Sequence, residues 1–541
     1  MRAFCTAEAG SLIATRPATA CGVVRSGGIR GPRTVVARHE ACLSERIHPP
    51  PEETALVHAT RPAPRGPVTS ASLSHARART RLAGCALFLA LAAGTAHAQS
   101  GDVIRPAPIT DLGGSGGGTT RYVDNANPAA SDAGPGSAAL PWRTILHAVK
   151  TAKAGETVLI RRGTYPENES GRVAVANTGT PGKPITFAAY PGDERLVIIP
   201  GAVFRITGKS YIVVRGLKVT GVTTASSPPR GFSVEGPGTD ITLSGNETYD
   251  TYSSGIGVWG VPFSQDPTDY QHLFNIVVEN NLVRLACNGG YDECITAANG
   301  VNHITLRNNE VTESVKEGID FKEGVFGGEI SGNYVHDIQK VAIYMDAAGV
   351  AIGPGGVENI DIVGNHVANI TDGSGIELGD EGRGSLLNLR VMNNLIHGAK
   401  MGVLVYAHPS GSGNATNITV INNTSFLNNA YGVRFNWPST RSSGFVARNN
   451  IGYRNAYGDW SVETGTVVVA DHNLWGVDPL FANAGAFDLR LRAGSPAIDA
   501  GSASAAPGFD FAGTARPQGA GFDIGAFEYL PGGPATAAAP R

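Results

Sequence analysis

The chain has 541 residues, which is too long for one ordinary globular core. Only 16% of its residues are charged and 71 are glycine, a composition that suits many short strands with tight corners and excludes a mainly disordered chain. The formal net charge of −3 provides no basic face, so a nucleic-acid partner is not expected.

Residues 77–98 have the pattern of a secretory signal peptide. Three arginines precede an apolar run, which is followed by the small-residue cleavage site Ala96-His97-Ala98. Because a signal peptide should begin a chain, we expect residues 1–76 to be either a wrongly assigned start or a disordered extension. The mature protein is then secreted or periplasmic and begins with a glycine-rich linker, 99–120. No other apolar stretch is long enough to span a membrane.

Residues 141–152 combine apolar and polar positions at helical spacing, which predicts a short amphipathic α-helix. We expect this helix to cap the first coil of a repeating fold. Residues 157–160 then begin the first sheet.

A strand that ends in asparagine recurs through the middle of the chain. Apolar residues alternate with polar ones in each copy, as in a half-buried strand. The copies are residues 240–246, 275–281, 303–309, 359–365, 388–394 and 417–423. From Asn281 to Asn450 the terminal asparagines lie 24 to 32 residues apart by their sequence numbers, a period typical of solenoids. Asparagine suits a corner because it tolerates the left-handed conformation, and stacked copies can form a ladder.

A second strand recurs within each coil, and its outward residues are predicted to stack into two columns. The first column is Gly257, Thr296, Asp320, Tyr344, Glu377, Leu404 and Arg434. The second column is Trp259, Ala298, Lys322, Asp346, Gly379, Tyr406 and Asn436. Charged residues concentrate on the consecutive coils between residues 294 and 346, which makes this face the candidate site.

Only two of the six cysteines, Cys287 and Cys294, follow the predicted cleavage site. In an exported protein this pair predicts a structural disulfide across a short loop. Towards the C-terminus, residues 476–530 lose the coil period and are expected to close the last coil, before a disordered tail, 531–541. Capped ends predict a monomer.

The first and last ordered segments resemble those of secreted right-handed β-helix proteins of the pectate-lyase-like superfamily. The resemblance rests on Tyr122-Val123-Asp124, on Pro141-Trp142-Arg143-Thr144-Ile145 and on Gly494-Ser495-Pro496-Ala497-Ile498-Asp499-Ala500-Gly501. It covers roughly residues 121 to 529. It implies an all-β fold, a right-handed parallel β-helix solenoid over residues 121–475 with an N-terminal capping helix, whose outer groove holds an acidic polysaccharide.

The stretch Glu317-Gly318-Ile319-Asp320-Phe321-Lys322 resembles a strand of alginate and chondroitin lyases. That resemblance implies that Glu317 is a calcium ligand and Lys322 the catalytic base. Those lyases place an arginine on the next coil, where this chain has Asp346. The calcium-dependent pectate lyases of the ninth family have similar opening segments and also use a lysine base.

β-Elimination of a uronic-acid polymer requires neutralisation of the substrate carboxylate, a base for the C5 proton and a proton for the leaving oxygen. A Ca²⁺ ion held by acidic side chains meets the first need. Lys322 meets the second if burial or a cation lowers its pKa. The predicted metal ligands are Glu317, Asp320, Asp346 and Glu293. Tyr344 and Arg434 are the remaining candidate catalytic residues, and Trp259, Tyr406, Asn436 and Trp437 are candidate sugar-binding residues.

Three alternatives stay open. A glycoside hydrolase would use Asp320, Asp346 and Glu377 as acid and base, without calcium. A C5-epimerase would abstract the same proton as a lyase and return it. A non-catalytic carbohydrate-binding protein would need Lys322 only as part of a solvated ion pair.

Overall fold

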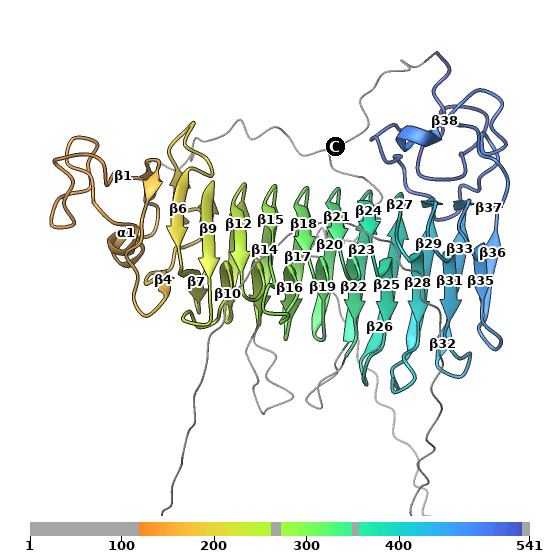
Figure 1. Cartoon of the computed structure of the whole chain (residues 1–541), viewed down its shortest axis with the longest axis horizontal. Coiled ribbons are helices and arrows are strands. Elements are labelled where there is room, and N and C mark those ends of the chain that lie inside the picture. Colours follow the sequence, from red (N-terminus) through yellow and green to blue (C-terminus); the bar gives the residue numbers. More distant parts are fainter. Residues whose placement is uncertain (1–117, 261–271, 349–355, 533–541) are drawn as a thin grey trace, which may run out of the picture. The chain divides into compact units, whose positions relative to one another are not determined.

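Successive strands of the chain add in turn to three parallel sheets, so that each turn of the chain forms one coil of a parallel β-helix (Figure 1). This computed structural model describes residues 118–260, 272–348 and 356–532. The predicted N-terminal extension, the predicted signal peptide, most of the predicted glycine-rich linker and residues 533–541 lie outside the described residues.

We name the sheets A, B and C in the order in which a coil enters them. Sheet A contains β1 (Thr120–Val123), β2 (Thr157–Ile160), β5 (Ile185–Ala189), β8 (Ile212–Arg215), β11 (Gly238–Ser244), β14 (Leu273–Glu279), β17 (Val301–Arg307), β20 (Val325–Ser331), β23 (Gly356–Val363), β26 (Ser385–Met392), β29 (Ala415–Ile421), β33 (Phe445–Arg448) and β36 (Val468–Asp471), and β32 (Ser442–Ser443) pairs with β29. Sheet B contains β3 (Gly163–Thr164), β6 (Val197–Pro200), β9 (Leu217–Val222), β12 (Glu247–Thr251), β15 (Leu282–Arg284), β18 (Glu310–Ser314), β21 (Tyr334–Ile338), β24 (His366–Ile370), β27 (Leu395–His397), β30 (Thr424–Phe426), β34 (Ile451–Tyr453) and β37 (Leu474–Trp475). Sheet C contains β4 (Arg172–Ala174), β7 (Val203–Thr207), β10 (Phe232–Glu235), β13 (Ile256–Trp259), β16 (Ile295–Ala298), β19 (Ile319–Phe321), β22 (Ile343–Asp346), β25 (Ser374–Gly379), β28 (Met401–Tyr406), β31 (Tyr431–Asn436) and β35 (Gly458–Val462).

One continuous apolar core runs through the stack, because each coil buries its inward side chains against the coils on either side. Alternation along each strand produces this core. In β22, for example, Ile343 and Met345 point inward and are fully buried. The residues between them point away from the core, so every strand also contributes to an outer face.

The corner between sheets A and B contains the predicted asparagine ladder. Its members are Asn246, Asn281, Asn309, Asn333, Asn365, Asn394, Asn423, Asn450 and Asn473, and each Nδ2 donates to the next Oδ1 at 2.9 to 3.1 Å. The left-handed conformation belongs to the residue before each ladder asparagine, as in Asn280 with φ 57° and Asn393 with φ 53°. The ladder amides also donate to backbone carbonyls, as Asn309 Nδ2 does to the Val278 carbonyl at 2.9 Å, so the buried polar groups of the corner have partners.

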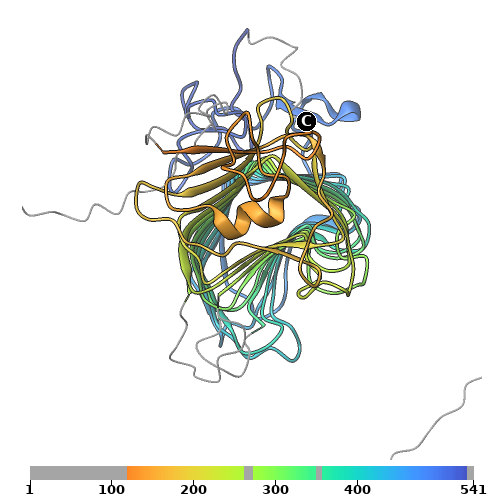
Figure 2. The same ribbon diagram turned by 90° about the vertical axis from the view of Figure 1, so that its left-hand side faces the viewer.

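The predicted capping helix is present as α1 (Ile145–Thr151), which lies across the first coils when the stack is viewed along its axis (Figure 2). Thr144 precedes it as the N-cap, its hydroxyl accepting from the His147 N–H at 3.0 Å. Ile145, Ala148 and Val149 are buried beneath the helix.

Residues that follow the last coil form a small antiparallel pair, β38 (Phe481–Asn483) and β39 (Asp488–Leu491), joined by the 3-10 turn Ala484–Ala486. The sequence predicts that this segment closes the last coil. In the structure its apolar side chains pack instead along the outer face of sheet B, against Leu395, Phe426 and Ile451. Val462, at the end of β35, the last strand of sheet C, is 38% exposed, so the C-terminal segment does not cover it.

Candidate functional site

The register of sheet C reproduces the first predicted column residue by residue, from Gly257 to Arg434. The second column is present on β13, β16, β22, β25, β28 and β31. Lys322 is its one irregular member, because β19 ends at Phe321 and Lys322 lies directly after the strand. The alternation of the sequence therefore determines which side chains share this outer face.

Lys322 lies among three carboxylates contributed by three consecutive coils. Its Nζ is 3.0 Å from Asp346 Oδ2, 3.1 Å from Asp320 Oδ2 and 3.3 Å from Glu293 Oε1. The side chains of Asp320 and Asp346 are only 1% and 2% exposed, although they lie on the outer face of the sheet. We call these four residues the Lys322 cluster. Thr296 also donates a hydrogen bond to Glu293 at 3.1 Å.

Burial and the repulsion between neighbouring carboxylates shift the pKa values of the Lys322 cluster. Burial raises the pKa of Asp320 well above its usual range and raises that of Asp346 to about 6, although Lys322 opposes both shifts. Burial disfavours the charge on Lys322, but the three carboxylates outweigh that effect and raise its pKa above the ordinary lysine value. The role of Lys322 as a base requires a lowered pKa, and the described arrangement favours the protonated ammonium instead.

The oxygens of the Lys322 cluster suit a hard cation. Asp320 Oδ1 and Asp346 Oδ1 are buried and have no hydrogen-bond partner, whereas Asp320 Oδ2 lies 3.1 Å from Lys322 Nζ. Carboxylate oxygens without proton donors are the ligand type that Ca²⁺ prefers. The donor set therefore fits calcium chemically. Nevertheless, across the described ranges no three His, Cys, Asp or Glu side chains surround a common point as a metal site requires, and Lys322 Nζ lies between these carboxylates.

Tyr344 and Glu377 follow Asp320 in the first column. The Tyr344 hydroxyl donates to Glu381 Oε1 at 2.9 Å. Burial raises the pKa of the Tyr344 phenol, so the hydroxyl keeps its proton. Burial likewise raises the pKa of Glu377 to about 7, with Glu381 and Asp346 adding to the shift. Glu377 is thus an acid that is partly protonated near neutral pH.

Two other predicted residues lie outside the Lys322 cluster. Glu317 Oε2 is 3.1 Å from Lys316 Nζ and forms no ion pair with Lys322 in the described structure, although its charge helps to raise the pKa of Glu293, after burial. Arg434 is four strands beyond β19, roughly 19 Å along the axis at about 4.8 Å per strand. It pairs there with Glu463 and lies over the Tyr431 ring. Arg434 cannot act on the same bond as Lys322.

The predicted sugar-binding residues fall into two groups. Trp259 is half-buried at one end of the outer face, where the Arg230 guanidinium lies 4.6 Å from its ring centroid. Tyr406 and Asn436 are half-buried neighbours at the other end. Trp437 is fully buried in the core, so its prediction as a stacking platform is wrong. It follows Asn436 directly, and the alternation of β31 turns it inward.

The predicted disulfide is not formed. Cys287 and Cys294 are free thiols, and both are fully buried. Burial, followed by the adjacent Cys294 side chain, raises the pKa of the Cys287 thiol well above its usual value. The two thiols are in contact and enclose the loop 288–293, which the sequence predicts a disulfide to close.

Sequence reasoning missed three residues near this face. Arg230 reaches across from another coil to form an ion pair with Asp292 at 3.0 Å, a pairing that no local motif signals. Tyr291 is 63% exposed and stacks on Tyr252 with their ring centroids 5.9 Å apart. Its position two residues before Glu293 was an available signal. Glu381, the partner of Tyr344, lies in a loop after β25 and had no signal.

The fold and this geometry define a parallel β-helix protein that carries an ion-paired carboxylate cluster on the outer face of one sheet. Residues 122–282 match the family model described as "Pel9A-like, right handed beta helix region", which agrees with the predicted hand. Among curated proteins the chain is similar to the uncharacterized protein YwoF of Bacillus subtilis strain 168, with 27% identity over 347 residues, 59% of this chain and 70% of that protein.

The solved structures to which the chain is similar include a pectate lyase and an alginate epimerase. Pectate lyase Pel9A shares 18% identity with a TM-score of 0.49, over 77% of this chain and 98% of that one. The periplasmic alginate epimerase AlgG shares 13% identity with a TM-score of 0.40, over 60% of this chain and 77% of that one. In the part of the chain that the structure describes, no helix has the length and apolarity to cross a membrane.

Proposed function

We propose that this protein is an exported polysaccharide lyase that cleaves a uronic-acid polymer by β-elimination at the Lys322 cluster. One observation carries the proposal: a lysine and three buried carboxylates from successive coils converge on one outer face. The Pel9A-like family match over residues 122–282 supports it, because Pel9A is named a pectate lyase. The predicted signal peptide supports export to the periplasm or beyond.

Lys322 is the proposed base. An amine can remove the C5 proton only after losing its own, and the carboxylates around it oppose that loss. A reduction in the negative charge around Lys322 would therefore activate it. Asp346, whose pKa lies at about 6, can supply part of that reduction by taking up a proton.

Calcium is the proposed source of the remaining charge neutralisation. Asp320, Asp346 and Glu293 would hold the ion, because their oxygens are the buried acceptors of the cluster and include two, Asp320 Oδ1 and Asp346 Oδ1, that have no hydrogen-bond partner. Bound there, Ca²⁺ would neutralise the substrate carboxylate and weaken the field that keeps Lys322 protonated. Glu317, which pairs with Lys316, would have to turn to join this set.

The other residues of the face have proposed roles set by their distance from Lys322. Tyr344 is one strand away and retains a proton that it can donate to the leaving oxygen. Trp259 and Arg230 would contact sugars on one side of the bond. Tyr406, Asn436 and Arg434 would contact them on the other side.

A carboxylate-dependent glycoside hydrolase is the second candidate function. It is favoured by the raised pKa values of Glu377, about 7, and Asp346, about 6, since a general acid must be protonated near the working pH. In this alternative Lys322 only orients substrate, and calcium is not required.

Product analysis distinguishes these candidates. Mature protein beginning at Gln99 is incubated with a panel of polyuronates, and the new chain ends are identified by mass spectrometry. A lyase leaves an unsaturated uronate end, whereas a hydrolase adds water across each broken bond. Saturated ends alone would reject the lyase proposal. An intact polymer with altered C5 configuration would indicate an epimerase. A polymer that is unchanged in length and configuration would favour a non-catalytic carbohydrate-binding protein.

A further inference from the structure

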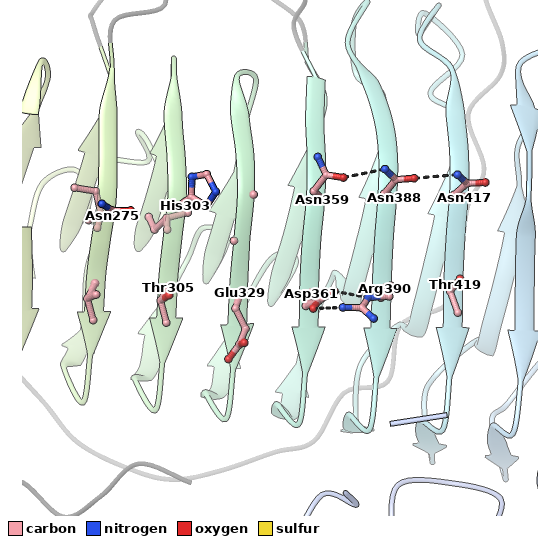
Figure 3. Close-up of a pocket in the computed structure, with 15 residues that line it drawn as sticks. Asn275, His303, Thr305, Glu329, Asn359, Asp361, Asn388, Arg390, Asn417 and Thr419 are labelled. Atoms are coloured by element: carbon pink, nitrogen blue, oxygen red, sulfur yellow. Dashed lines mark hydrogen bonds and ion pairs between the residues drawn. The ribbon is translucent and has the colours of Figure 1, made fainter. Parts of the chain in front are cut away.

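A groove lies on the outer face of sheet A (Figure 3). The Lys322 cluster belongs to sheet C, a different sheet of the β-helix. The groove has a volume of about 980 Å³. Its lining comes from six consecutive strands, β14, β17, β20, β23, β26 and β29. The groove therefore follows the axis of the β-helix over several coils.

A bend at the same register in each of these strands produces the groove. One residue per strand has φ between 54° and 76°, and these residues are Asn275, His303, Gly327, Asn359, Asn388 and Asn417. Asparagine tolerates this conformation, but glycine adopts it more readily and does so in β20. A glycine alone would therefore satisfy the backbone at the bend. The bend does not by itself account for an amide side chain on three successive coils.

The three amides at these coils form an exposed row. Asn388 Nδ2 donates to Asn359 Oδ1 at 2.8 Å, and Asn417 Nδ2 donates to Asn388 Oδ1 at 2.9 Å (Figure 3). All three side chains are exposed, unlike the buried ladder at the corner. Because water competes for exposed amides, this row contributes little to folding. The hydrogen bonds within the row hold the amides in one orientation. Each amide still has N–H or oxygen positions that can form hydrogen bonds toward solvent.

A second polar row runs parallel to the first, two residues further along each strand. It consists of Thr305, Glu329, Asp361, Arg390 and Thr419, which are neighbours in the register of sheet A. Arg390 Nε donates to Asp361 Oδ1 at 2.6 Å, so these two charges cancel. Glu329 is the remaining carboxylate. The groove is thus hydrophilic, close to neutral and slightly negative.

We propose that this groove binds an uncharged stretch of a linear polysaccharide along the axis of the β-helix. The coils repeat about every 4.8 Å, close to the advance of one sugar ring in an extended chain, so each coil can offer the same amide to successive sugars. Paired donors and acceptors match sugar hydroxyls. A nucleic acid would need a positive groove, and an apolar helix or a membrane would need an apolar one. The polymer class rests on the proposed function, whereas the groove and its neutrality do not.

Two opposite variants test this inference in the full chain. Asn388→Gly removes the central amide and keeps the backbone, because Gly327 already adopts the same conformation in the same column. Gly327→Asn adds an amide, and the nearest atoms to its Cβ would be those of the His303 ring at 3.7 Å, an ordinary contact. The probes are polygalacturonate and the same polymer with its carboxyls methyl-esterified, compared by affinity electrophoresis.

We expect the esterified polymer to bind more tightly than the anionic one. Asn388→Gly should weaken its binding by roughly threefold to tenfold, the effect of one or two hydrogen bonds, and Gly327→Asn should strengthen it. Any cleavage of polygalacturonate should stay unchanged, and unfolding midpoints should fall only slightly, because both variants change a residue with positive φ.

Equal binding by the parent and both variants, or no binding of the esterified polymer, would overturn the inference. A dimer that Asn388→Gly dissociates would also overturn it, by assigning the groove to a second copy of the chain. If no cleavage occurs but the two variants shift binding in opposite directions, the lyase proposal is wrong and the proposal that the groove binds polysaccharide is supported.

Discussion

Lys322 is held on sheet C by charge rather than by apolar packing. Its Nζ is within 3.3 Å of three carboxylates, and two of these are almost fully buried. Removing one partner from a buried ion pair leaves charge without compensation, which typically costs about 3–5 kcal/mol. The same lysine is therefore expected to contribute to both stability and activity.

The variant Lys322→Met should lower the free energy of unfolding by roughly 3 kcal/mol at about pH 8, and by less at about pH 5. Without the ammonium the carboxyl pKa values rise further on folding. A carboxyl whose pKa is raised on folding stabilises the folded state at low pH and loses that contribution as the pH rises. Chemical unfolding at both pH values measures the difference.

Lys316→Met is the matched control for that experiment. Lys316 forms a single, more exposed ion pair with Glu317, so its loss should cost less than about 1 kcal/mol. Equal losses for Lys322→Met at the two pH values would contradict the electrostatic account of the cluster.

Tyr291 offers an exposed ring beside the acidic cluster. It stacks on Tyr252, which fixes its position, and Glu293 follows two residues later. We expect Tyr291→Ala to raise the KM for a polyuronate by roughly twofold to tenfold and to leave kcat nearly unchanged, because a stacking contact binds substrate and transition state alike. Tyr457→Ala, which removes an exposed ring on another coil, is the control. A fall in kcat alone would assign Tyr291 a different role.

At the scale of the elements, the corner ladder is the device that holds sheets A and B in register. Asn394 is fully buried, donates to the Ile362 carbonyl and to Asn423, and accepts from Asn365. Asn394→Ala should cost about 3 kcal/mol or more, because several buried groups lose their partners together. Asn388→Gly, an exposed member of the other row, should cost far less. Guanidinium unfolding compares the two, and similar losses would contradict this division.

A histidine pair under the C-terminal segment is expected to make the protein sensitive to acid. His366 Nε2 and His397 Nε2 of β24 and β27 are 3.0 Å apart, and His397 stacks on Phe487. Burial, followed by the charge of neighbouring histidines, lowers both pKa values to about 4. Since the unfolded values are near 6.5, stability should be full above that pH and fall as the pH decreases towards 4.

Thermal unfolding between about pH 7 and pH 4 measures this effect. His397→Leu should flatten the decline, because one buried group no longer has to stay neutral. His303→Asn, which alters an exposed histidine of the sheet A groove, should leave the decline unchanged. A parent protein whose midpoint is constant over this range would contradict the prediction.

For the described part of the molecule, the repeated strand pattern made the fold predictable. Contacts made by segments outside the repeat could not be predicted in the same way. The alternation in each coil fixed which residues face outward, and so the register of Asp320 with Tyr344 follows from the sequence. The same alternation shows that Trp437 faces inward, although its chemistry favoured a sugar platform. Arg434 pairs with Glu463, which follows β35 directly and so continues the register of β31 with β35. The position of the C-terminal segment along sheet B depends on residues that have no repeat.

The central claim is that Lys322 and its carboxylates form a calcium-assisted base. The most direct test follows the ultraviolet absorbance of unsaturated uronate ends, with parent, Lys322→Met and Lys316→Met proteins, in calcium or in chelator. We predict a rise for the parent and for Lys316→Met in calcium only, and at least a roughly hundredfold loss for Lys322→Met. A rise that survives Lys322→Met, or one that chelator does not affect, would contradict the account.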